Sequence, residues 1–120
     1  MSAAYRAGMK HVSLGDKSLL MGDDAADTLL EYARLVGDSD GADTVTLKAI
    51  GPDGSTTEVG ILLNSNTSLI VESTHSDVVP PDNSEVVEDL RERMRAITRP
   101  ASAQPEERWV ESEYDNTDMI

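Results

Sequence analysis

Three aspartates near the middle of the chain have the spacing of potential metal ligands. Asp38, Asp40 and Asp43 surround Gly41, and alternate acids in a glycine-containing turn can converge on a hard cation such as calcium. A calcium loop of the helix-loop-helix kind also needs a glutamate at its twelfth position, where this chain has Ala49, and a helix after it. We therefore expect a solvated, turn-forming acidic loop here, with no bound metal or other cofactor.

A second group of acids, Asp23, Asp24 and Asp27, could take part in acid-base chemistry or bind Mg²⁺. On a helix, positions 23 and 27 share a face and position 24 does not, so at most two of the carboxylates converge. All three lie where a helix is expected to begin, and carboxylates there cap free N–H groups and interact favourably with the helix dipole. Helix capping is the role that we expect.

The two histidines are the candidates for a general base or a zinc ligand. His75 lies between Ser73 and Asp77, and these are the residue types of a hydrolase triad. However, the chain has no G-x-S-x-G elbow, and His11 lies 64 positions away without any zinc-binding spacing. We expect His75 in a polar loop and His11 on an edge strand, and we predict no catalytic residue.

The segment from 106 to 114 contains the only tryptophan of the chain among several acids. An aromatic residue flanked by charges is typical of a segment that becomes ordered on a partner. The alternative is that Trp109 packs on its own domain, because aromatic residues make up only 3% of the chain and phenylalanine is absent. The candidate partner-binding residues are Glu106, Glu107, Trp109, Val110, Glu111 and Tyr114.

The strongest signal in the composition is the net charge of -13. It opposes binding to nucleic acids and to anionic membranes, because both present negative charge. A protein with a basic surface is therefore the expected partner, and the chain could also form a homo-oligomer. The alternative is that the acidity only serves solubility or is shared by all proteins of the source.

The absence of cysteine rules out disulfides, thiolate metal sites and thiol catalysis, and it fits a reducing compartment. No window approaches the roughly 18 apolar residues of a membrane span, and the N-terminus has no signal-peptide core. A cytoplasmic location is expected.

The elements that must position these residues follow from the hydrophobic pattern. Residues 10–14 and 19–21 predict a short strand or hairpin, and alternating aliphatic residues predict strands at 44–49, 57–63 and 68–73. Helical spacing follows Gly22 and ends near Gly37, which is expected at the C′ position. A second helix is expected from Asp82 to about Thr98, with an ion pair between Asp89 and Arg93.

These elements predict an α+β fold in which a small antiparallel sheet packs against two helices. The sheet would contain a three-stranded meander, formed by the last three strands, and a short N-terminal strand or hairpin. We expect one domain over residues 1–99 and an acidic tail over 100–120. The residues after Pro100 include six acids and one arginine.

Function follows from charge, since no specific catalytic motif is present. The expected function is a non-enzymatic, acidic protein-binding module, such as an inhibitor or immunity-type protein that neutralises a basic partner. The alternative is a structural or adaptor subunit of a larger assembly, such as a phage particle, that docks through its C-terminal tail.

Overall fold

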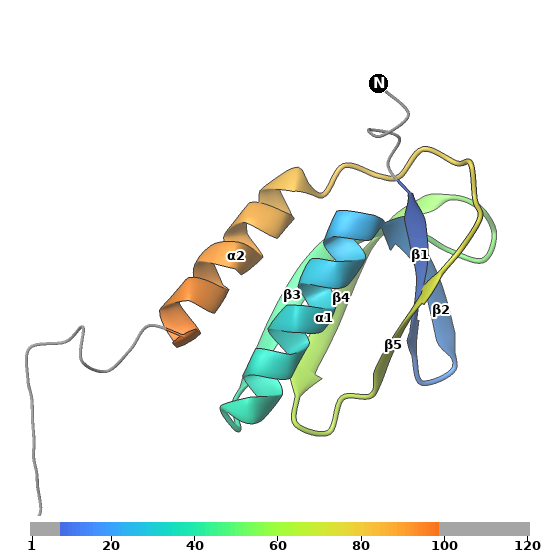
Figure 1. Cartoon of the computed structure of the whole chain (residues 1–120). Helices are drawn as coiled ribbons and strands as arrows, with labels where there is room; N and C mark the ends of the chain where they lie inside the picture. Colours follow the sequence, from blue (N-terminus) through green and yellow to red (C-terminus); the bar gives the residue numbers. More distant parts are fainter. Residues whose placement is uncertain (1–7, 99–120) are drawn as a thin grey trace, which may run out of the picture.

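The computed structural model describes residues 8–98 and has the expected α+β class, with a five-stranded antiparallel sheet packed against two helices (Figure 1). Within this range, no helix has the length and apolar character needed to cross a membrane. The elements in chain order are β1 (Met9–Leu14), β2 (Lys17–Gly22), α1 (Asp23–Asp38), β3 (Ala42–Ile50), β4 (Thr56–Asn64), β5 (Leu69–Ser73) and α2 (Ser84–Thr98).

The first two strands form the predicted hairpin. They pair from Met9 with Gly22 to Leu14 with Lys17. Gly15 lies in the connecting turn with a φ of 58°, a conformation that glycine adopts without a steric penalty. Because side chains alternate across a strand, Val12 faces the helices while its neighbours face the other side of the sheet.

The predicted meander is wrong in its last strand. β3 and β4 pair along their whole length, but β5 pairs with β1 at the opposite edge, so the strand order is β4-β3-β2-β1-β5. The connection from Asn64 to Leu69 therefore carries the chain from one edge of the sheet to the other (Figure 1). The Thr67 hydroxyl accepts a hydrogen bond from the N–H of Asn64 at 2.9 Å, so the loop itself occupies part of the β4 edge on which β5 was expected to lie.

The two halves of the sheet meet at a single position. Leu20 of β2 pairs with Ile50 of β3, and this is the only register pair between these strands. We call this junction the β2–β3 seam. Beyond it, β3 continues without a neighbouring strand on its inner side.

Helix α1 holds the two halves together. It contacts all five strands, and its inner face carries the predicted apolar residues Ala26, Leu29 and Val36, which are buried. The sheet side of this core is aliphatic, as the absence of phenylalanine requires. It includes Val12, Leu19, Met21, Val45, Leu47, Ala49, Ile61 and Leu63.

The C-terminus of α1 differs slightly from the sequence prediction. Gly37 belongs to the last helical turn and not to the C′ position, since the helix continues to Asp38. The left-handed residue is Asp40, with a φ of 58°. Gly41 then donates its N–H to the carbonyl of Val36 at 3.1 Å, which closes the end of the helix. Aspartate tolerates this backbone conformation better than most residues with a side chain.

Helix α2 lies alongside α1 (Figure 1) and buries Val87 and Leu90 against the core. Its predicted ion pair is confirmed, with Arg93 Nη2 2.7 Å from Asp89 Oδ2. The second nitrogen of the same guanidinium, Nη1, lies 2.7 Å from Asp43 Oδ2 at the start of β3. Arg93 thus links α2 to the sheet as well as to its own helix.

Candidate functional site

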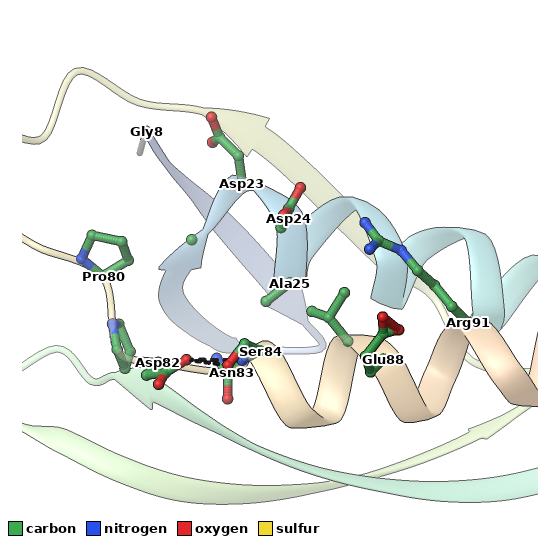
Figure 2. Close-up of a pocket in the computed structure, with 13 residues that line it drawn as sticks. Gly8, Asp23, Asp24, Ala25, Pro80, Asp82, Asn83, Ser84, Glu88 and Arg91 are labelled. Carbon is green, nitrogen blue, oxygen red and sulfur yellow. Dashed lines mark hydrogen bonds between the residues drawn. The ribbon is translucent and has the colours of Figure 1, made fainter. Parts of the chain in front are cut away.

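The main candidate site is a cavity of about 740 Å³ between the N-termini of the two helices (Figure 2). Its walls come from three parts of the chain. These are Gly8 before β1, the junction of β2 with α1, and the segment that runs from Pro80 into α2. Its charged lining consists of Asp23, Asp24, Asp82, Glu88 and Arg91. Four acidic side chains and one arginine therefore line one space, although within residues 8–98 no three of the acids converge closely enough to hold a metal ion.

Two glycines allow the chain segments to approach each other here. A β-carbon on Gly8 would lie 2.6 Å from Asp23 Oδ2, and one on Gly22 would lie 3.2 Å from the Cβ of Pro80. The carbonyl of Gly8 also accepts the N–H of Asp23 at 3.0 Å, which fixes the first residue of α1. Larger side chains at positions 8 and 22 would crowd these contacts.

Asn83 fixes the start of α2 against the sheet. Its side chain is buried, with the amide oxygen 2.8 Å from the N–H of Lys48 and the amide nitrogen 2.8 Å from the carbonyl of Lys48. The amide thus bonds the inner side of β3 just beyond the β2–β3 seam, where a neighbouring strand would otherwise do so. Its backbone carbonyl accepts the N–H of Val87 at 2.9 Å and begins the helix.

The predicted start of the second helix is displaced by one residue: α2 begins at Ser84 with Asn83 at the N-cap position, and Asp82 supports its first residue from outside the helix. Its Oδ1 accepts the N–H of Ser84 at 2.9 Å and the hydroxyl of Ser84 at 2.7 Å (Figure 2). The hydrogen bond from this N–H holds the pKa of the Asp82 carboxyl below its usual value of 3.8, and the hydroxyl adds to the effect. The carboxylate at this wall of the cavity is therefore ionised at neutral pH.

The charged lining of the cavity, four acids and one arginine, has a net charge of -3, which favours a cation over an anion. A helix N-terminus alone favours an anion such as phosphate. Here Asp23 and Asp24 already occupy the first turn of α1, and Glu88 lies in the second turn of α2. Among residues 8–98, no lysine or arginine forms an ion pair with any of the four carboxylates that line the cavity. Arg91, Lys10 and Lys48 lie close enough to offset part of this charge without forming ion pairs with it, and the remainder is available to a cationic group from outside.

The structure divides the predicted group of Asp23, Asp24 and Asp27. The first two line the cavity, while Asp27 binds Lys10 of β1, with 2.8 Å between Lys10 Nζ and Asp27 Oδ1. This hydrogen bond raises the pKa of Lys10. Gly22 holds the N-cap position and no side chain caps α1. The expected capping hydrogen bonds are therefore absent from this helix, and Asp23 and Asp24 act on its dipole from within the first turn.

The acids of the predicted turn do not converge, and two of the three, Asp38 and Asp43, have separate partners. Asp38 forms an ion pair with Arg34 at 3.2 Å. Asp43 accepts hydrogen bonds from the hydroxyl of Tyr32 and from Arg93. In the described part of the chain, no group of three or more histidine or acidic side chains is placed to hold a metal ion.

Asp43 is the centre of a polar network between α1, β3 and α2. The Tyr32 hydroxyl holds the pKa of Asp43 below its usual value, and the N–H of Thr44 and Arg93 act in the same direction. Burial raises the pKa of Tyr32, and its hydrogen bond to Asp43 raises it further. The Arg93 guanidinium also lies 5.9 Å from the centre of the Tyr32 ring. This network holds α1, β3 and α2 together, and none of its three side chains lines the cavity between the helix N-termini.

The two histidines lie on different segments of the chain, His11 in β1 and His75 after β5. His75 is exposed in the loop after β5, and its neighbour Ser76 donates its hydroxyl toward the sulfur of Met9 at 4.0 Å and accepts the N–H of Val78. His11 was expected on an edge strand, but β1 lies between β2 and β5. Its Nδ1 is 3.4 Å from the hydroxyl of Ser18 on the neighbouring strand.

The candidate partner-binding residues of the tail, from Glu106 to Tyr114, lie outside the described residues. The cavity itself was missed by sequence reasoning. Asp82 was identified only as a helix cap, and nothing local in the sequence shows that it lies near Asp23 and Asp24. Comparison of the chain with protein-family models, with curated proteins and with solved structures finds no match.

Proposed function

We propose that this domain is a non-enzymatic, acidic protein-binding module that neutralises a basic partner, in the manner of an inhibitor or immunity-type protein. The observation that carries the proposal is the cavity between the two helix N-termini, with its four carboxylates unpaired by described basic residues. Its volume of about 740 Å³ is ample for one or two long side chains.

The lining suits a lysine or an arginine of the partner. The aliphatic stem of such a side chain can lie against Ala25, Pro80 and Val87, while its charged group lies among the carboxylates. The net charge of -13 would draw a basic protein toward the domain over a longer range and raise the association rate. Charge thus provides attraction, and the cavity provides a place of contact.

The test uses fluorescein-labelled octalysine as the probe, with binding measured by fluorescence anisotropy. The Asp24→Asn, Glu88→Gln double variant removes two carboxylates of the cavity and should weaken binding about fivefold, if each exposed pair contributes about 0.5 kcal/mol. The matched control, Asp16→Asn with Glu72→Gln, removes the same charge from exposed positions outside the cavity and should change affinity less than about twofold.

Binding should also disappear in about 1 M salt, where the Debye length falls to about 3 Å. Equal weakening by the two double variants would mean that octalysine responds to net charge alone, and the cavity would then have no specific part in binding.

A further inference from the structure

One edge of the sheet has main-chain groups that face outward. Asn83 binds both main-chain groups of Lys48, so the even-numbered residues of β3 point away from β4. Lys48 lies opposite Glu58 in the antiparallel register. The even-numbered residues of β4 must therefore point away from β3, toward the outer side of the sheet.

Part of this edge is closed by the following loop. The Thr67 hydroxyl accepts the N–H of Asn64 at 2.9 Å and lies 3.2 Å from the carbonyl of Leu62. Within residues 8–98, we find no such partner for the main-chain groups of Glu58 and Gly60. Gly60 also has no side chain to shield the backbone. The open part of the β4 edge therefore runs from about residue 56 to residue 60.

A groove of about 820 Å³ lies beside this open edge. The charged residues in its lining are two acids, Asp53 and Glu58, and one base, Lys17. Its aliphatic lining at β4 comes from Val59 and Ile61, and its far wall, on the other side of β3, comes from Leu14 and Leu19 of the β1–β2 hairpin. An open strand edge next to an apolar groove is the arrangement in which proteins bind an extended peptide as an added strand.

We propose that the β4 edge adds an extended strand of a partner protein in which basic and aliphatic residues alternate. Successive side chains of a strand point to opposite faces. One set would lie beside Val59 and Ile61, on the side of β4 that lines the groove, and the other would lie beside Glu58. The basic character of this strand rests on the proposed function, while the main-chain pairing is independent of it.

A second copy of this chain is the less suitable occupant. Pairing of β4 with β4 would bring together two molecules of charge -13 and would place their Glu58 side chains near the same short edge. A basic strand meets two groove carboxylates against one ammonium group and the negative field of the whole domain.

The experiment uses the full chain and a fluorescein-labelled peptide of four lysine-valine repeats. A second peptide carries N-methyl groups on alternate amides, which removes the donors needed for pairing. Amide hydrogen exchange on addition of the first peptide should show new protection at Glu58 and Gly60. Val59 and Ile61 should change little, because they already bond to β3. The N-methylated peptide should bind at least about tenfold more weakly, since several main-chain hydrogen bonds are lost.

Charge reversal at the two sheet edges provides the matched comparison. Glu58→Lys lies on the β4 edge, and Glu72→Lys makes the same change at an exposed position on β5, at the opposite edge. The first should weaken peptide binding about fivefold and the second less than about twofold. Circular dichroism of both variants verifies that they fold.

Several results would overturn the strand addition. These are failure of the lysine-valine peptide to bind, equal binding of the N-methylated peptide, equal effects of the two charge reversals, or self-association of the chain through β4 in sedimentation experiments. If protection appears instead at Asp24 and Ala25, in the uncapped first turn of α1, the peptide occupies the cavity, so the strand addition fails while the proposed function stands. If protection follows the β4 edge but the Asp24→Asn, Glu88→Gln variant binds octalysine normally, the strand addition stands and the proposed role of the cavity fails.

Discussion

The side chain of Asn83 makes a strong prediction for stability. It is 6% exposed and makes two hydrogen bonds of 2.8 Å with the main chain of Lys48. Asn83→Ala removes both bonds, each with a net contribution of about 1 kcal/mol, and leaves the two main-chain groups of Lys48 without their protein partner. We expect the free energy of unfolding to fall by about 2–3 kcal/mol.

Urea unfolding followed by far-ultraviolet circular dichroism measures this change. With a denaturant slope of about 1 kcal/mol/M for a domain of this size, the midpoint should move down by roughly 2 M. Asn66→Ala is the matched control, since Asn66 lies exposed in the loop before β5, and it should change stability by less than about 0.5 kcal/mol. If Asn83→Ala costs no more than the control, packing alone positions α2 and the bonds to Lys48 contribute nothing measurable.

Three further predictions concern stability, each measured by urea or thermal unfolding. Leu90→Ala should cost about 2–4 kcal/mol, because Leu90 is 1% exposed in the contact of α2 with the core; a loss below about 1 kcal/mol would contradict this. Asp40→Gly should stabilise the domain by up to about 1 kcal/mol by relieving a positive φ, and a lower melting temperature would be the contrary result. The folded-state pKa of Asp43 lies below its usual value of 3.8, so the stability it provides is present above about pH 4 and is lost as the pH falls toward the folded value; Asp43→Asn should therefore be less sensitive to acid than the wild type between about pH 5 and 2, and equal sensitivity would exclude this role.

Local patterns in the sequence predict most of the elements. The helical spacing of Ala26, Leu29 and Val36 indicates α1, although Leu30, which was expected on the same face, is exposed. A similar pattern with the Asp89–Arg93 pair indicates α2. Each signal depends on residues within one or two turns of each other, so it is independent of the rest of the fold. The α+β class follows from these elements, because both helices and the sheet have one aliphatic side to bury.

The position of β5 could not be predicted in this way. Leu69 and Val71 give β5 an aliphatic face that fits either sheet edge, and the polar residues after Asn64 are compatible with a hairpin. The bond between Thr67 and Asn64 spans only three residues, and the choice depends on the pairing of Val12 with Val71, which are distant in the sequence. Tertiary contacts therefore decide the topology.

The candidate site was beyond prediction for the same reason. Asp23 and Asp82 are 59 positions apart in the sequence, and each has a sufficient local explanation at the start of its own helix. Their meeting depends on the close approach of Gly22 to Pro80 and on the hold of Asn83 on β3. The sequence shows which residue types are present, but it does not show that these two segments lie close together.

The β2–β3 seam gives the domain a preferred line of weakness. One residue pair joins the two hairpins directly, and the remaining connection passes through α1 and the amide of Asn83. Under pulling force, or in a rare thermal opening, the β3–β4 hairpin should separate from β1, β2 and β5 before either half loses its own pairing. A partner that contacted both the β3–β4 hairpin and the group of β1, β2 and β5 would therefore slow this separation without altering the closed structure.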